Sequence, residues 1–155
     1  MAIERVKAYF ETVGRAADVR EFDVSSATVE LAAAALQVEA ARIAKTLAFE
    51  AEGGCALVVM AGDTKADNRK FKQFFGRKAK MLTAEAVLAY TGHAVGGTCP
   101  FALATEVPVY LDESLRRFTT VFPACGSANS AIELTPDELF RYANARDWID
   151  VGKTA

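Results

Sequence analysis

Few residues of this sequence are suited to disulfide formation or metal binding. The 155-residue chain has three cysteines and a single histidine, His93. Cys55, Cys99 and Cys125 are odd in number and lie 44 and 26 residues apart, which fits neither a disulfide framework nor the C-x-x-C pairs of a zinc site. We therefore expect reduced cysteines, no metal and no cofactor, as in a protein of the cytoplasm.

The sequence also lacks a long apolar segment. No run approaches the roughly eighteen apolar residues of a membrane span, and the charged start, Met1-Ala-Ile-Glu-Arg-Val-Lys7, is unlike a signal peptide. Hydrophobic residues make up 52% of the chain and charged residues 25%, which is typical of a globular domain. We expect one domain over residues 1–155 and no membrane partner.

Basic residues are concentrated in one part of the chain, although the formal net charge is −2. The window from Lys65 to Lys80 has seven basic residues and one acid, Asp67, whereas the rest has eleven basic and nineteen acidic residues. A polyanion is attracted to one face of such a molecule and repelled by the others. The window therefore indicates a surface for RNA or a nucleotide, although a solvated, lysine-rich helix has the same composition.

Helix signals recur along the chain, as apolar residues at spacings of three and four that follow Ser, Thr or Asp caps. The clearest start is Thr135-Pro136-Asp137-Glu138, where Thr135 is the N-cap, Pro136 the first helical residue and Glu138 the end of a capping box. The expected helices cover residues 1–15, 28–36, 68–75, 83–90, 112–118 and 136–143, with one further turn at 39–44.

Strand signals are most frequent in the middle of the chain. Residues 45–50 and 55–60 are joined by Ala51-Glu-Gly-Gly54 and predict a hairpin whose second strand is buried on both faces. Further strands are expected at 18–24, 108–111, 119–124, 130–134 and 148–151, the third and fourth of these paired across the turn at 126–129. Short hairpin links oppose a regular βαβ alternation. We predict an α+β fold with a mixed, mostly antiparallel sheet, curved or barrel-like and flanked by helices.

The segment Gly92 to Pro100 is too rich in glycine for a helix or a strand. Three glycines let its backbone approach a ligand, and consecutive free N–H groups in such a turn form an anion-binding nest or an oxyanion hole. An ordinary tight turn that needs positive φ has the same composition. Both interpretations stay open on composition alone.

Lys45 is unusual because it lies between the apolar pairs Ile43-Ala44 and Leu47-Ala48, with no acid nearer than Glu39 or Glu50. A lysine at a cleft edge holds a phosphate or polarises a carbonyl. The alternative is an exposed lysine at a strand end whose stem covers apolar surface.

Cys99 and His93 invite comparison with a cysteine nucleophile activated by an imidazole. Against this, Cys99 precedes Pro100, which makes it extended, and no helix N-terminus lowers its pKa. We expect Cys99 to be a small residue of a pocket wall and His93 to lie on the surface. Ser127 has no G-x-S-x-G elbow around it, so we interpret it as a turn residue.

Four segments in order resemble a known family: Ile43-Ala-Lys45-Thr-Leu47, Gly62-Asp-Thr-Lys-Ala-Asp67, Gly96-Gly-Thr-Cys-Pro-Phe101, and Ala124-Cys-Gly-Ser127 with Ile132-Glu-Leu-Thr-Pro-Asp-Glu-Leu139. Together they are similar to the YbaK-like family, the free-standing relatives of the editing domain of bacterial prolyl-tRNA synthetase. The similarity runs from about Val24 to Leu139. It implies the YbaK fold and an aminoacyl-tRNA deacylase that removes wrongly attached amino acids, typically from proline tRNA.

The resemblance also implies roles for single residues. Lys45 matches the family's near-invariant lysine, and Gly96 to Pro100 matches its G-x-x-x-P loop, whose backbone borders the ester carbonyl. The implied catalytic residues are Lys45, Gly97 and Thr98. The implied substrate-binding residues are Gly96, Cys99, Pro100, Phe101, Gly126 and Ser127, and the implied tRNA-binding residues are Lys65, Arg69, Lys70 and Lys72.

The expected reaction is hydrolysis of mischarged tRNA, most simply proline tRNA that carries alanine, cysteine, serine or threonine. Prolyl-tRNA synthetase is a further expected partner. Familiar members have Gly-Gly-Ile-Ser-Pro where this chain has Gly-Gly-Thr-Cys-Pro, so the resemblance leaves the amino acid open. The alternatives are a non-catalytic module that binds a nucleotide or aminoacyl-tRNA, and a hydrolase that depends on Cys99.

Overall fold

The computed structural model describes residues 2–154, and its helices follow the sequence signals closely. Within this range the α-helices are α1 (Ala2–Thr12), α2 (Val29–Leu36), α3 (Asn68–Phe75), α4 (Ala84–Thr91) and α5 (Pro136–Tyr142). Short 3-10 helices are η1 (Ala16–Asp18), η2 (Ala40–Arg42) and η3 (Glu113–Arg117). Thr28, Asp67, Thr83 and Thr135 cap α2, α3, α4 and α5 with their side chains, as the sequence indicates.

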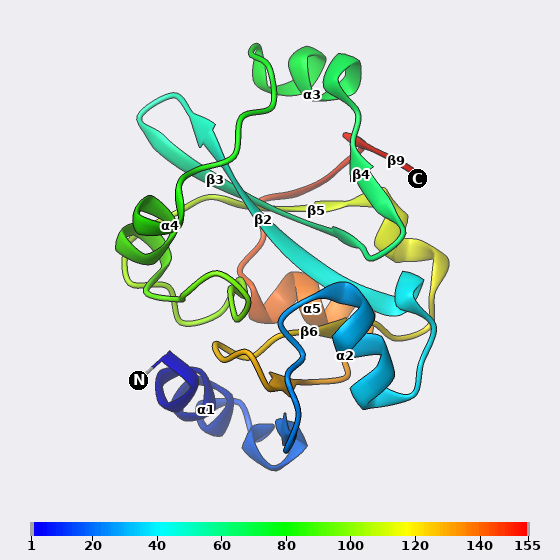
Figure 1. Ribbon diagram of the computed structural model, residues 1–155. Helices are drawn as coiled ribbons and strands as arrows, with labels where there is room; N and C mark the ends of the chain where they lie inside the picture. The colour runs from blue at the N-terminus through cyan, green and yellow to red at the C-terminus, as the bar shows by residue number, and fades with distance from the viewer. Residues whose placement is uncertain (1, 155) are drawn as a thin grey trace.

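The strands form one central sheet and two small ones. The central sheet has the order β6-β2-β3-β5-β8, from β2 (Ile43–Ala51), β3 (Gly54–Ala61), β5 (Val109–Asp112), β6 (Phe122–Pro123) and β8 (Asp147–Ile149). The small sheets pair β1 (Arg20–Glu21) with β7 (Ser130–Ala131) and β4 (Thr64–Ala66) with β9 (Gly152–Thr154). Figure 1 shows the long β2–β3 hairpin at the centre, with α3 on one side and α1, α2 and α5 on the other.

The α+β class with a mixed, curled sheet is confirmed, but the central sheet has more parallel pairings than expected. Among the described strands, β2 and β3 are antiparallel, whereas β2–β6, β3–β5 and β5–β8 are parallel. The reason is that β5 and β8 follow long connections, which contain α3 and α4 before β5, and η3 and α5 before β8. Parallel neighbours require such crossovers, while only the β2–β3 link is a hairpin.

The hairpin has two faces that pack against different parts of the chain. Directly opposed residues share a face, so Thr46 lies with Val59 and Ala48 with Leu57, whereas Lys45 lies with Met60. The Thr46 face carries the main core, which includes α1, α4 and α5 residues such as Phe10, Val87 and Leu139. The Lys45 face packs on a second core, where Phe71 of α3 is fully buried.

Several expected elements differ in length. The strand at 18–24 is reduced to β1, and the strand at 119–124 to β6. Residues 130–134 pair with β1 through β7, while the expected pairing with 119–124 survives as a Val121–Leu134 bridge. The sequence does not predict the pair of strands β4 and β9. Each has three residues, and with Lys65 and Lys153 exposed they are too short to show an alternation of polar and apolar residues.

The capping box at the start of α5 offers a test of the fold. The Thr135 hydroxyl accepts the Glu138 N–H at 3.1 Å, and the Glu138 carboxylate accepts the Thr135 N–H at 2.9 Å. Thr135→Ala should lower the free energy of unfolding by about 1 kcal/mol, measured by urea denaturation. Thr135→Ser keeps the acceptor and should stay near wild type; equal losses in both variants would contradict this role for the hydroxyl.

Candidate functional site

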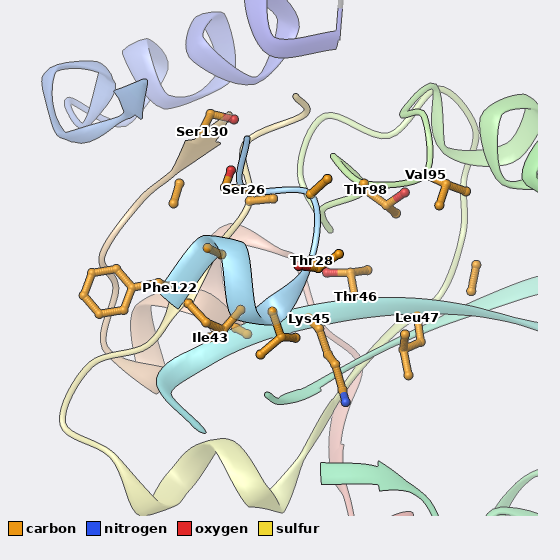
Figure 2. Close-up of a pocket in the computed structure, with 18 of the residues that line it drawn as sticks. Ser26, Thr28, Ile43, Lys45, Thr46, Leu47, Val95, Thr98, Phe122 and Ser130 are labelled. Carbon is orange, nitrogen blue, oxygen red and sulfur yellow. The ribbon is translucent and has the colours of Figure 1, made fainter. Parts of the chain in front are cut away.

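A cavity of about 270 Å³ lies beside β2, on the outer edge of the hairpin. Four separate segments enclose it: residues 26–32 at the start of α2, residues 43–48 of β2, residues 95–98 of the glycine loop, and residues 122–131 around β6 and β7. Met81 and Val95 lie at its rim and are 56% and 64% exposed, respectively. Figure 2 shows these segments converging on the space above β2.

The cavity exists because pairing on this edge of β2 is interrupted. The ladder with β6 covers only Ile43 and Ala44, and the edge is next used at Ala48, whose carbonyl accepts the Leu82 N–H at 3.0 Å. Along an antiparallel strand, the backbone N–H and C=O groups of successive residues point to alternate sides, so those of Thr46 point to the same side as those of Ala48. The Thr46 N–H and C=O therefore point away from β3, where a bound molecule can use them.

Lys45 borders the same opening from the other face of the strand. Figure 2 shows its side chain extending away from Thr46 and Thr98, and among the described residues its ammonium has no hydrogen bond or ion pair. Burial lowers the pKa of Lys45, and the charges of Asp63 and Glu30 oppose that shift. The ammonium is thus half-buried, weakly attracted to two acids, and available to an anion. It does not face the glycine loop across the cavity, as a single catalytic cluster would require.

The glycine loop supplies fewer free amides than expected. The Gly97 N–H donates to the Ala94 carbonyl at 3.0 Å, so it is not available to an oxyanion. The Thr98 hydroxyl donates to the same carbonyl at 3.2 Å. Among the described residues no hydrogen bond uses the Gly96 or Thr98 N–H. Gly97 is required for packing instead, because a Cβ there would lie 2.7 Å from the Ser127 carbonyl carbon.

Cys99 and His93 meet, but inside the core rather than in the cavity. The Cys99 Sγ lies 3.5 Å from His93 Nε2, which is also 2.8 Å from the Phe101 carbonyl oxygen. All three residues are buried, which corrects the expectation of a surface histidine. Burial raises the pKa of Cys99 to about 12 and lowers the pKa of His93. A buried, protonated thiol beside a neutral imidazole is not an activated nucleophile.

Five of the six expected substrate-binding residues lie outside the lining of this cavity. Cys99 and Phe101 pack in the main core, and Pro100 borders a separate hollow beside Tyr9 and Tyr142. Gly126 has φ +91° and packs on the α1 backbone. Gly96 and Thr98 line the cavity, whereas Ser127 is outside its lining and packs against the loop at Gly97.

The basic residues between Lys65 and Lys80 differ in whether they are exposed or bound to other parts of the protein. Lys65, Arg69 and Lys72 are exposed. Lys70, in contrast, donates to Asp150 and to the Gly152 carbonyl, both at 2.9 Å, and thereby fixes α3 to the C-terminal segment. Asp150 accordingly raises the pKa of Lys70. Because α3 packs on the Lys45 face of the hairpin, the exposed cations and Lys45 are on the same side of the sheet.

Four polar side chains of the cavity were missed by sequence reasoning, two of them Thr28 and Ser130. Ser26 and Thr46 are the other two. Strand alternation places Thr46 opposite to Lys45, so that residue could have been found; no pattern in the sequence marks Ser26. Across residues 2–154 no cluster of His, Cys, Asp and Glu could hold a metal, and no described helix is long and apolar enough to cross a membrane.

Comparisons with known proteins agree on one family. The sequence model of the family described as "Aminoacyl-tRNA editing domain" matches residues 23–142. The chain is 54% identical over 154 residues to the "Uncharacterized protein YwhH" of Bacillus subtilis, covering 99% of this chain and 98% of that one. It is 28% identical to the "Putative Cys-tRNA(Pro)/Cys-tRNA(Cys) deacylase EbsC" of Enterococcus faecalis, covering 77% and 74% of the two chains.

A solved structure has the same fold. It is the crystal structure of "a putative trans-editing enzyme for prolyl tRNA synthetase", with a TM-score of 0.88 and 32% identity over 98% of this chain and 97% of that one.

The burial of Lys45 predicts how its removal affects stability. Lys45→Met deletes a partly desolvated charge and keeps the stem, so the free energy of unfolding at pH 7 should rise. The unfolded chain has the ordinary lysine pKa near 10.5 and the folded chain a lower one, so between these values the unfolded state binds more protons and wild-type stability rises with pH. The difference between variant and wild type should therefore shrink from pH 7 to 10 in urea denaturation. A variant less stable than wild type at pH 7 would instead show that Lys45 serves the fold.

Proposed function

The chain belongs to the aminoacyl-tRNA editing domain family, and we propose that it hydrolyses the ester bond of mischarged tRNA. The observation that carries this proposal is the pairing gap on β2. On one side of that strand lies a half-buried ammonium that has no hydrogen bond or ion pair within residues 2–154, and on the other lies a small, mostly apolar cavity. An aminoacyl-tRNA end has the matching parts, an anionic sugar-phosphate and a compact aminoacyl group joined by an ester.

The chemistry requires little from side chains. An aminoacyl ester is already activated, so it suffices to position water and to stabilise the oxyanion that develops in the transition state. The Thr98 N–H is the donor we assign from the loop, and the outward Thr46 N–H is a second donor within the same opening. Lys45 holds the sugar-phosphate at the mouth, and the neighbouring ribose hydroxyl is free to carry a proton. No protein nucleophile takes part, in keeping with the buried thiol of Cys99.

The tRNA approaches from the α3 side of the sheet. Lys65, Arg69 and Lys72 are exposed there, and Lys45 is on the same face at the edge of the cavity. Such cations attract the phosphate backbone and position it without reading its sequence. The terminal adenosine then reaches the β2 edge, with its aminoacyl group in the cavity on the far face.

The substrate we propose is proline tRNA carrying a small wrong amino acid, namely alanine, cysteine, serine or threonine. The volume of the cavity, about 270 Å³, supports a compact aminoacyl group. The names of the similar proteins support proline tRNA and an association with prolyl-tRNA synthetase. The reaction then takes place in the cytoplasm, where tRNA is charged.

Removal of Lys45 tests the catalytic proposal. Lys45→Ala and Lys45→Met should each lower the rate of deacylation about a hundredfold, because the ester is then no longer held in its reactive position, while circular dichroism stays unchanged. The assay measures free amino acid released from mischarged tRNA under single-turnover conditions. If wild-type protein binds the tRNA and releases no amino acid, the chain is a binding module rather than a hydrolase.

Salt dependence tests the path of the tRNA. Neutralising Arg69 and Lys72 with glutamine should weaken binding and reduce the slope of log K against log salt by about one for each phosphate that the protein no longer neutralises. Lys7→Gln is the matched control, because Lys7 is on α1 and paired with Glu21 at 2.6 Å. A slope that falls as much in the control, or in neither variant, would remove α3 from the interface.

A further inference from the structure

The single histidine of the chain makes a hydrogen bond across the glycine loop. His93 is fully buried, and its Nε2 lies 2.8 Å from the carbonyl oxygen of Phe101, eight residues further along the chain. Because a carbonyl oxygen only accepts, Nε2 carries the proton and donates it. His93 Nδ1 is then unprotonated, and it has no hydrogen bond among the described residues. The imidazole is therefore neutral, and it joins the two ends of the loop inside the core.

The segment between these two ends borders the cavity. The Ala94 carbonyl accepts the Gly97 N–H at 3.0 Å, which closes a turn directly after the histidine. Gly96, inside this turn, has φ +97°. Gly96 and Thr98 both line the cavity. One end of the loop is thus fixed in the core by the imidazole, while its tip carries the backbone donor that we assign to the oxyanion.

The histidine is itself attached to α4. Its backbone N–H donates to the Thr91 hydroxyl at 3.0 Å, and that hydroxyl donates to the Val87 carbonyl at 2.6 Å. The Ala104 N–H donates to the Thr91 carbonyl at 3.0 Å and so holds the outer base of the loop. A continuous set of hydrogen bonds therefore runs from α4 through the imidazole to the far end of the loop.

The surroundings of the ring oppose a second proton. Burial lowers the pKa of His93, the hydrogen bond to Phe101 opposes this shift, and the charge of Arg5 on α1 adds to it. Cys99, whose Sγ lies 3.5 Å from Nε2, is an uncharged thiol because burial raises its pKa to about 12. The second proton would go to Nδ1, where no described residue accepts it. The fold thus keeps the imidazole neutral, as a donor at Nε2.

We propose that His93 is a positioning residue of the candidate site, whose imidazole holds the 95–98 segment so that the Thr98 N–H faces the open edge of β2. This inference rests on the proposed deacylase function, because His93 acts on the reaction only through the loop. Without the link the donor moves from its place, which lowers the rate of the chemical step. The cations assigned to tRNA binding lie on the other side of the sheet, so affinity for tRNA should not depend on His93.

The test compares two replacements of the imidazole. His93→Gln keeps an N–H donor near the position of Nε2, whereas His93→Leu keeps an apolar side chain without the donor. In single-turnover deacylation, His93→Leu should lower the maximal rate about ten- to a hundredfold, since a displacement of about 1 Å costs up to that much. The protein concentration at half-maximal rate should not change. His93→Gln should stay within about threefold of wild type, because it restores the hydrogen bond.

Thr135→Ala is the matched control for stability, because it is expected to destabilise the fold at α5 without touching the loop, and it should retain the wild-type rate. If His93→Leu keeps that rate, if both His93 variants lose the same factor, or if only the affinity for tRNA falls, the inference is wrong and the deacylase proposal stands. If wild-type protein releases no amino acid, both fail. Should His93→Leu not fold, His93→Asn replaces it, because its amide is too short to reach the Phe101 carbonyl.

The pH dependence of stability tests the neutral, buried state of the ring. The unfolded chain has the ordinary histidine pKa near 6.5 and the folded chain a lower one, so between these values the unfolded state binds more protons and stability falls as the pH falls. His93 is the only histidine. In urea denaturation, the unfolding constant of wild type should therefore rise relative to that of His93→Gln by up to about tenfold for each pH unit below 6.5. Parallel profiles from pH 7.5 to 5 would contradict the inference.

Discussion

The candidate site of this molecule depends on one interruption in β-sheet pairing. Between Ala44, where the ladder with β6 ends, and Ala48, which bonds to Leu82, no strand of the described part of the chain pairs with the outer edge of β2. A backbone edge inside a folded domain must be paired, solvated or bound to a ligand. The start of α2 and the glycine loop approach this edge without pairing to it, and the space between them is the cavity. Gly97 permits the loop to pack against the Ser127 backbone and so fixes the far wall.

The alternation of side chains along β2 gives this strand two chemically different faces. Lys45 faces the second core and α3, where the exposed basic residues lie, and Thr46 faces the cavity. One strand therefore separates a cationic surface from a small, mostly apolar space, with its own peptide groups in between. Keeping the Lys45 ammonium half-buried costs stability, because burial lowers its pKa against the attraction of Asp63 and Glu30. Such a cost is expected where a group is retained for a ligand rather than for the fold.

Local signals in the sequence predicted the elements and several of their limits, but not the way they assemble. Caps at Thr28, Asp67, Thr83 and Thr135 gave four helix starts, and the Gly53-Gly54 link gave the hairpin. The parallel placement of β5 and β8 depends on long crossovers, which no local pattern encodes. At the candidate site, the resemblance named Lys45, Gly96 and Thr98, and all three line the cavity; their roles stay predictions. The resemblance also implied that Cys99 and Phe101 belong to the pocket, although both side chains pack in the main core. The packing of Gly97 against Ser127 and the meeting of residues 26–32, 43–48 and 95–98 around the cavity are contacts between distant segments, so they required the structure.

The central claim is that the ester of an aminoacyl-adenosine lies across the open edge of β2. A crystal structure with a non-hydrolysable analogue, in which an amide replaces the ester of aminoacylated adenosine, tests it most directly. We expect the aminoacyl group between Thr46 and the 95–98 loop, the amide linkage at the Thr46 backbone, and the ribose beside the Lys45 ammonium. An analogue bound elsewhere, with the edge between Ala44 and Ala48 left unoccupied, would contradict the account.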